Sequence, residues 1–303
     1  MLGTTVAAAT QLEAFWARSD SEFLEHFRPM LGEARELGAS LVALPRYVGV
    51  ALLGVLSAEA MEHCLLDAVR PANCEDLARC YESAGSGLTR AYELAGARLA
   101  REAGLLLVFG STLAMDCNGR LSEVAYLFGP DGATLGIQAR THLAWGESEE
   151  RWDTGDELCV FETPVGRIGL LIGADVSYPE VSRILCLQGA NVLVHLRLGG
   201  SLLREAWMRG LWREIQANQV FGIESCLIGD DLPGRARIHG PLEMADDGSG
   251  VLGCTAASDR SGIVATELDF AALQRVVDAY PIYRSLNCGL YRECFPGMYS
   301  HGR

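Results

Sequence analysis

The chain has 303 residues, 49% of them hydrophobic, so it can bury a large core as one large domain or as two small ones. Its formal charge of −14 and pI of about 4.9 argue against a nucleic-acid or anionic-membrane surface, because both need a basic patch. The first residues lack the pattern of a signal peptide and no apolar run reaches about 18 residues, so we expect a soluble cytoplasmic protein that spans no membrane.

In the first half, apolar strand-like runs alternate with amphipathic helices, which indicates an α/β fold. A Pro-Asp-Gly sequence between two of the runs is typical of a hairpin turn. In chain order we predict a strand at Thr5–Gln11, a helix at Ser21–Leu37, a strand at Ser40–Pro45, a helix at Leu88–Glu102, a strand at Gly104–Gly110, and a hairpin of Glu123–Phe128 and Thr134–Ala139.

The second half continues the same alternation. We predict a helix at Pro179–Gln188, a strand at Asn191–Leu196, a long helix at Leu202–Asn218, strands at Val220–Ile228, Gly250–Leu252 and Ile263–Leu268, and a last helix at Phe270–Ala279. No linker or low-complexity stretch divides the chain, so we expect a single domain over residues 1–303. The sequence pattern of residues 57–90 predicts their structure least clearly. The segment is either an insertion over the mouth of a pocket or a set of surface helices.

The ten cysteines are scattered along the chain. Cys64, Cys74 and Cys80 form the tightest group, and their spacing matches no zinc or CxxC pattern, so we expect packed thiols, no metal site and no cofactor. All 25 basic residues in the Lys+Arg count are arginines, so the chain has no lysine for any purpose.

The segment from Val165 to Glu180, VGRIGLLIGADVSYPE, resembles the nucleophile segment of the nitrilase (carbon–nitrogen hydrolase) superfamily. Six further fragments resemble motifs of that family in the same order along the chain: the opening strand that ends at Gln11, LGASLVALP from Leu37, GPDG through THL from Gly129, TGDE with FETPVG from Thr154, GANVLV from Gly189, and ANQ from Ala217. The resemblance implies a four-layer α-β-β-α sandwich, usually dimerised through helices, and therefore a homodimer.

The same resemblance implies a catalytic Glu, Lys and Cys, in which the thiolate attacks an amide or nitrile carbon. At the three matching positions this chain has Arg46, Arg140 and Gly173. Glycine has no nucleophile, and an arginine at the base position cannot accept a proton at neutral pH. The triad implied by the family is therefore not intact.

Two interpretations stay open. The first is a family member without amidase or nitrilase activity, which binds a small anionic molecule or acts as a scaffold or regulatory subunit. The second is a carbon–nitrogen hydrolase or related enzyme with altered chemistry at the old pocket, based on Asp175, Glu149, Glu150 or a relocated thiol (Cys186 or Cys226). Other candidate pocket residues, at or near strand ends, are Tyr178, His195 and Arg197.

The two arginines lead to a geometric expectation. If Arg46, Arg140 and Gly173 converge, two guanidinium groups meet in a partly enclosed cleft and need a negative partner. We expect that partner to be Glu149, Glu150 or Asp175, which would close the old site with ion pairs. An anionic ligand held by the arginines is the alternative.

Overall fold

The computed structural model describes residues 3–56, 64–116, 118–229 and 231–298. Its strands form one hydrogen-bonded path in the order β5-β4-β3-β2-β1-β10-β9-β8-β7, and β6, β11, β12 and β13 pair beside it. The strands are β1 Thr4–Glu13, β2 Leu41–Ala43, β3 Leu106–Met115, β4 Leu121–Phe128, β5 Thr134–Ala139, β6 Trp152–Asp153, β7 Val160–Thr163, β8 Gly166–Ile172, β9 Val192–Leu198, β10 Phe221–Ile228, β11 Arg237–His239, β12 Val251–Cys254 and β13 Gly262–Asp269.

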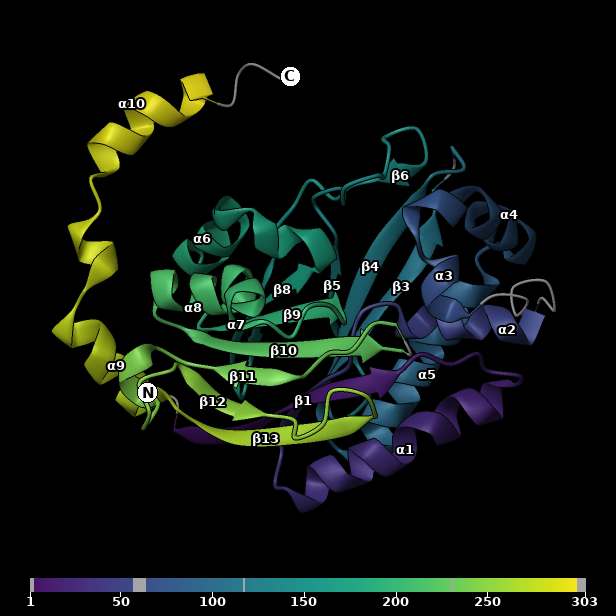
Figure 1. The fold of residues 1–303 in the computed structure, drawn as a ribbon, viewed down its shortest axis with the longest axis horizontal. Helices are drawn as coiled ribbons and strands as arrows, with labels where there is room; N and C mark the ends of the chain where they lie inside the picture. Colours follow the sequence, from purple (N-terminus) through teal and green to yellow (C-terminus); the bar gives the residue numbers. More distant parts are fainter. Residues whose placement is uncertain (1–2, 57–63, 117, 230, 299–303) are drawn as a thin grey trace.

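Helices cover both outer faces of this folded sheet, except for the last helix, α10, which lies away from it (Figure 1). They are α1 Asp20–Glu36, α2 Leu53–Leu56, α3 Leu65–Ala68, α4 Cys74–Ala84, α5 Gly87–Ala103, α6 Pro179–Leu187, α7 Arg204–Trp207, α8 Arg213–Asn218, α9 Phe270–Ala279 and α10 Cys288–Met298. At the sheet centre β1 pairs in parallel with both β2 and β10, which joins the two halves of the fold.

Three separate cores show the layering. Side chains of successive strand residues point to opposite faces, so each strand contributes to two cores. On β8, Leu170 and Ile172 pack in the inner core between the two halves of the sheet, whereas Leu171 packs under α6 and α8. On β1, Ala7 belongs to the inner core and Ala8 to the core under α1 and α5. The order of layers is therefore helix, sheet, sheet, helix, as expected.

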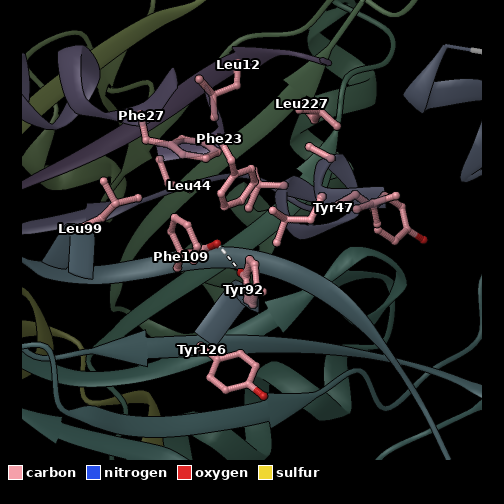
Figure 2. Packing of buried hydrophobic residues seen from close by; sticks show 14 of the residues in the cluster. Leu12, Phe23, Phe27, Leu44, Tyr47, Tyr92, Leu99, Phe109, Tyr126 and Leu227 are labelled. Carbon is pink, nitrogen blue, oxygen red and sulfur yellow. Dashed lines mark hydrogen bonds between the residues drawn. The ribbon is translucent and has the colours of Figure 1, made fainter. Parts of the chain in front are cut away.

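The core under α1 and α5 is rich in aromatic side chains (Figure 2). Phe23 and Phe27 of α1 meet Phe109 of β3 edge-on, and Tyr92 of α5 stacks on the same ring at 4.8 Å between centroids. The Tyr92 hydroxyl donates a hydrogen bond to the backbone oxygen of Phe109. Edge-on and offset ring pairs add to the area that they bury, so this core fixes α1 and α5 on β3.

The predicted elements differ from the structure in several places. The strand expected to end at Gly110 continues to Met115. The long helix expected at Leu202–Asn218 is divided into α7, a π-helical turn (Met208–Trp212) and α8, because Gly210 leaves helical geometry. Strands β6, β7 and β11 and helices α2 and α10 were not predicted. Of the uncertain segment 57–90, residues 57–63 lie outside the described residues, and α3, α4 and the start of α5 occupy the rest.

No helix within the described ranges is long and apolar enough to cross a membrane. The same ranges hold no group of His, Cys, Asp or Glu side chains that could bind a metal ion.

Candidate functional site

Arg46, Arg140 and Gly173 each follow the carboxyl end of a strand. Arg46 comes three residues after β2, Arg140 directly after β5, and Gly173 directly after β8. The next residue, Tyr47, helps to set the position of the Arg46 side chain. Its backbone is in the left-handed region, with a φ of 63°. The Tyr47 ring lies 4.2 Å from the Arg46 guanidinium carbon, and its backbone N–H donates to Ser111 Oγ at 2.8 Å.

The Arg46 side chain fills the space beside Gly173. A Cβ placed on Gly173 would lie 2.6 Å from Arg46 Cζ and 2.8 Å from its Nη1. Real Cβ atoms do not approach other atoms so closely, so no residue with a side chain fits at 173 while Arg46 stays in place. The backbone φ of Gly173 is 54°, which also favours glycine. Gly173 and Arg46 are therefore sterically matched.

Glu123 of β4 is the main counter-ion of this site. Its carboxylate accepts from Arg46 Nε at 2.8 Å and Nη2 at 2.6 Å, a bidentate pair, and from Ser111 Oγ at 2.7 Å. Arg140 Nε lies 3.3 Å from the same carboxylate, whose side chain is 0% exposed. Burial alone would raise the pKa of Glu123, but the Arg46 charge and hydrogen bonds outweigh it, so the pKa is lowered.

Glu147 completes the network from the loop after β5. Its Oε2 accepts from Arg140 Nη1 at 2.7 Å and from the backbone N–H of Ala144 at 2.7 Å. The Arg140 guanidinium carbon lies 4.9 Å from the Trp152 ring centre. Two arginines and two glutamates thus form a buried network of zero net charge, which we call the closed site (Arg46, Glu123, Arg140 and Glu147).

The counter-ions differ from those expected from the sequence. Glu149 and Glu150 are exposed in the turn that precedes β6, so the expectation that they neutralise the arginines is wrong. Asp175 is buried, but it accepts from the backbone N–H groups of Thr141, His142 and Ile172 at 3.0–3.1 Å and pairs with neither arginine. It ties the turn after β5 to the turn after β8.

The remaining candidate pocket residues divide into two groups. Tyr178 is 40% exposed and stacks on His142 at 3.8 Å between ring centres, at the outer edge of the site. His195 lies deeper, and its Nε2 donates to the Gly173 backbone oxygen at 3.1 Å, because a carbonyl can only accept. Arg197 belongs to a second network further along the sheet.

The second network is centred on Glu224. Cross-strand pairing places His195 of β9 beside Glu224 of β10, and Glu224 beside Arg237 of β11, so the three side chains share one face. Glu224 Oε1 lies 2.9 Å from Arg197 Nε and 3.3 Å from Arg237 Nη1. Burial opposes ionisation of Glu224, but Arg197 and His195 outweigh it, so the pKa of Glu224 is lowered. This network also includes His239, the residue whose ring stacks on Trp207.

Two cavities of appreciable size lie elsewhere. One, of about 620 Å³, lies between α9, β12 and β13, and the other, of about 400 Å³, lies near the start of β1 and β2. Neither is lined by Arg46, Arg140 or Gly173. Neither of these two cavities therefore opens onto the closed site, whose charged side chains are buried against one another.

Comparison with known proteins decides the family. Residues 6–276 match the model of the carbon–nitrogen hydrolase family. The chain belongs to this family. Among solved structures it resembles a carbon–nitrogen hydrolase of Helicobacter pylori G27, with 21% identity, a TM-score of 0.70 and coverage of 98% of this chain and 99% of that one.

A second similar structure is a mutant amidase from Nesterenkonia sp. AN1, in which acrylamide has added to the active-site cysteine. It shares 18% identity with a TM-score of 0.69, over 95% of this chain and 99% of that one. At such identities these two structures show the fold alone, and the fold that they share with this chain agrees with the expected sandwich.

The sequence relatives are amidases and other hydrolases, and they match in part. Omega-amidase NIT2 of Homo sapiens is 25% identical over 204 residues, 64% of this chain and 72% of the relative. Omega-amidase NIT2-A of Xenopus laevis is 31% identical over 107 residues, 33% of this chain and 38% of the relative. A hydrolase of Schizosaccharomyces pombe is matched over 61% of its length, so the chain spans less than two thirds of several of these relatives.

Proposed function

We propose that this family member does not hydrolyse carbon–nitrogen bonds and acts instead as a scaffold or regulatory subunit. One observation carries the proposal: the Arg46 guanidinium, paired with buried Glu123, occupies the space that a side chain at position 173 would need. Loss of a nucleophile alone lowers kcat by about 10⁶-fold in a nucleophile-dependent hydrolase. The chain also has no lysine, since all 25 residues in its Lys+Arg count are arginines.

Relocated thiols do not support the alternative of altered chemistry. Burial raises the pKa of Cys186 to about 12 and that of Cys226 to about 12. The thiolate is the nucleophilic form, and at pH 7 such thiols hold only about one part in 10⁵ of it. Both thiols are also almost fully buried in the cores.

The carboxylates that the alternative would use are unsuited to catalysis in other ways. Both Asp175 oxygens accept backbone hydrogen bonds, and Thr141 Oγ1 donates to one of them at 3.0 Å, so Asp175 is occupied in holding two turns together. Glu149 and Glu150 are exposed to solvent, outside the closed site. We therefore favour the non-catalytic interpretation.

Ammonia release tests this proposal. The purified chain is incubated with ω-amides, N-carbamoyl amines and nitriles, each of which releases ammonia on hydrolysis, beside human omega-amidase NIT2 as an active relative. Esters release no ammonia, so their hydrolysis is followed by the acid that forms. We expect no turnover above the buffer rate. Turnover that disappears in Cys186→Ser or Cys226→Ser would show that a relocated thiol works, and turnover that survives both changes would show a chemistry that needs neither of these thiols. Either outcome would overturn the proposal.

A small anion bound near Arg140 is a second candidate, supported by a separate observation. Arg140 Nη2 and Trp152 Nε1 are buried donors without a hydrogen-bond partner among the described residues. Unpaired buried donors are costly, and a small anion or a water could accept from them. Thermal shift with chloride, acetate and phosphate tests this idea, because a specific site should saturate and should disappear in Arg140→Gln.

We also propose that the chain works as a homodimer. The outer surface of α6 exposes Ile184 and Leu187, at 43% and 58% of their areas. Large apolar side chains grouped on one helix are typical of a surface that another subunit covers. Sedimentation should give twice the chain mass, and co-purification with an active relative would favour a regulatory partner over a homodimer.

A further inference from the structure

The most exposed large apolar side chain among the described residues is a tryptophan on the loop that follows β5. Trp145 is 99% exposed, and the next in order, Tyr280, is 70% exposed. Aromatic side chains usually bury about 150–250 Å² each, but Trp145 keeps almost all of its area in water. Tryptophan is also enriched among the residues that dominate binding at protein interfaces. The exposed indole therefore points to a contact with another molecule.

A hydrogen-bonded turn presents this indole. The Glu147 N–H donates to Ala144 O at 3.1 Å, and Gly146 has a φ of 90°. Positive φ at the third residue alone is typical of a type II turn, so Trp145 lies at its tip. Glu147 Oε2 accepts from the Ala144 N–H and from Arg140 Nη1, each at 2.7 Å. The buried ion pair of the closed site thus holds the turn in place.

A second turn follows directly and carries two carboxylates. The Arg151 N–H donates to Ser148 O at 3.1 Å, which puts Glu149 and Glu150 at the tip of this turn. Both are exposed, and neither forms an ion pair within the ranges that the structure describes. Arg151, the nearest basic residue along the chain, pairs instead with Glu75 of α4. The tip of the second turn is therefore negative and has no internal counter-ion among the described residues.

An indole beside two free carboxylates fits a cationic segment. The two tips are four to five residues apart, so at most about 18 Å separates them even on an extended chain. A guanidinium or ammonium group is attracted to the face of an indole, and carboxylates bind cations through charge-assisted hydrogen bonds. An apolar partner surface would bury Glu149 and Glu150 unpaired, which is costly. A second copy of this chain, with a formal charge of −14, would repel the first.

We propose that these two turns, which we call the docking turns (residues 144–151), bind a basic segment of a partner protein. A guanidinium or ammonium group of that segment covers the Trp145 indole, and neighbouring cations pair with Glu149 and Glu150. The inference rests on the scaffold or regulatory role proposed above, and it adds the kind of partner and the surface that binds it. The docking test measures binding and the ammonia test measures turnover, so failure of one proposal is distinct from failure of the other.

Fluorine NMR tests the docking at the indole itself. The chain is labelled with 5-fluorotryptophan, which gives one signal for each of its five tryptophans. The Trp145 signal is the one that is lost in Trp145→Phe. The probe is a peptide of four Arg-Gly repeats, which supplies guanidinium groups on an unstructured backbone. We expect the Trp145 signal to shift and saturate as this peptide is added, while the other four signals stay in place.

Fluorescence anisotropy of the same peptide, labelled with fluorescein, gives the affinity of each variant at low salt. Trp145→Ala should weaken binding about tenfold or more, because the indole is the central contact. Glu149→Gln combined with Glu150→Gln should also weaken binding and should reduce its dependence on salt.

Two matched controls remove similar groups elsewhere on the surface. Tyr280→Ala deletes the next most exposed aromatic ring, and Glu33→Gln combined with Glu36→Gln deletes two exposed carboxylates of α1. Both controls should bind the peptide like the unmodified chain. Equal weakening in the α1 control and in the docking-turn variants would overturn the proposal, because it would mean diffuse attraction to an acidic protein.

Four other results would also overturn it. One is the absence of any shift of the Trp145 signal at a peptide concentration of about 1 mM. Another is Trp145→Ala binding as tightly as the unmodified chain. Equally tight binding of a Leu-Gly repeat peptide would show an apolar site rather than a basic one. A dimer that dissociates in Trp145→Ala during sedimentation would show that a second copy, and not a basic partner, covers the indole.

Discussion

Replacing Glu123 by Gln tests the closed site most sharply as a structural unit. The change keeps the size of the side chain and removes its charge, which leaves Arg46 buried without its carboxylate while Arg140 keeps Glu147. Breaking a buried ion pair by removing one partner costs about 3–5 kcal/mol, because the other charge stays buried and uncompensated. At about 2 °C per kcal/mol for a large domain, Tm should fall by about 6–10 °C.

Glu102→Gln is the matched control. Glu102 also faces two arginines, Arg28 and Arg98, but its side chain is 37% exposed on the helical surface. Both guanidinium groups remain in water when that carboxylate is lost, so we expect a much smaller fall in Tm. Thermal unfolding followed by circular dichroism measures both variants. Equal shifts for Glu123→Gln and Glu102→Gln would refute the claim that the buried network holds the site closed.

Three further outcomes follow from the structure. Gly173→Ala should lower the free energy of unfolding by about 2–4 kcal/mol, and Gly38→Ala, the control, by about 1 kcal/mol. Both glycines have positive φ, but only a Cβ at 173 meets a guanidinium, at 2.6 Å. Equal losses of stability in urea melts would contradict this. Burial lowers the pKa of His239 to about 4, so between pH 6.5 and 4 only the unfolded state binds a proton at this residue. The contribution of His239 to stability should be constant above pH 6.5 and should fall by about 3 kcal/mol as the pH drops to 4. His239→Asn should flatten this dependence of stability on pH. Cys186 and Cys226 should resist iodoacetamide in the native chain while exposed thiols react, and mass spectrometry that finds either one labelled as fast as Cys64 would show that they are not buried.

Much of the fold was predictable from local pattern. The hairpin strand Thr134–Ala139 and the helix Phe270–Ala279 have the predicted bounds, because turn chemistry and apolar spacing specify both. The break at Gly210 was not predictable, since it depends on distant contacts: Trp207 stacks on His239, and Trp212 Nε1 donates to Ser249 O at 2.7 Å.

The closed site was predictable in position but not in partners. The resemblance to the family gave Arg46, Arg140 and Gly173, and the structure brings them together around one carboxylate. Glu123 is 77 residues from Arg46 along the chain, so only tertiary folding joins them. A signal did exist: Glu123 shares its strand face with the buried Ala125 and Leu127, and an inward-facing carboxylate requires a positive partner.

Strand β11 was missed for a related reason. It has only three residues, and its charged members Arg237 and His239 read as a polar loop, although both are buried against the Glu224 network. In the structure Arg237 pairs with Glu224, and Ile238 between the two charged residues packs in the inner core.

A crystal structure of the chain with the region of Gly173 well resolved tests the central claim most directly. The account predicts the Arg46 guanidinium packed against Gly173, with Nε and Nη2 bonded to Glu123 and Arg140 bonded to Glu147. An Arg46 side chain turned towards solvent, with an open cavity beside Gly173 lined by unpaired Glu123, would contradict it.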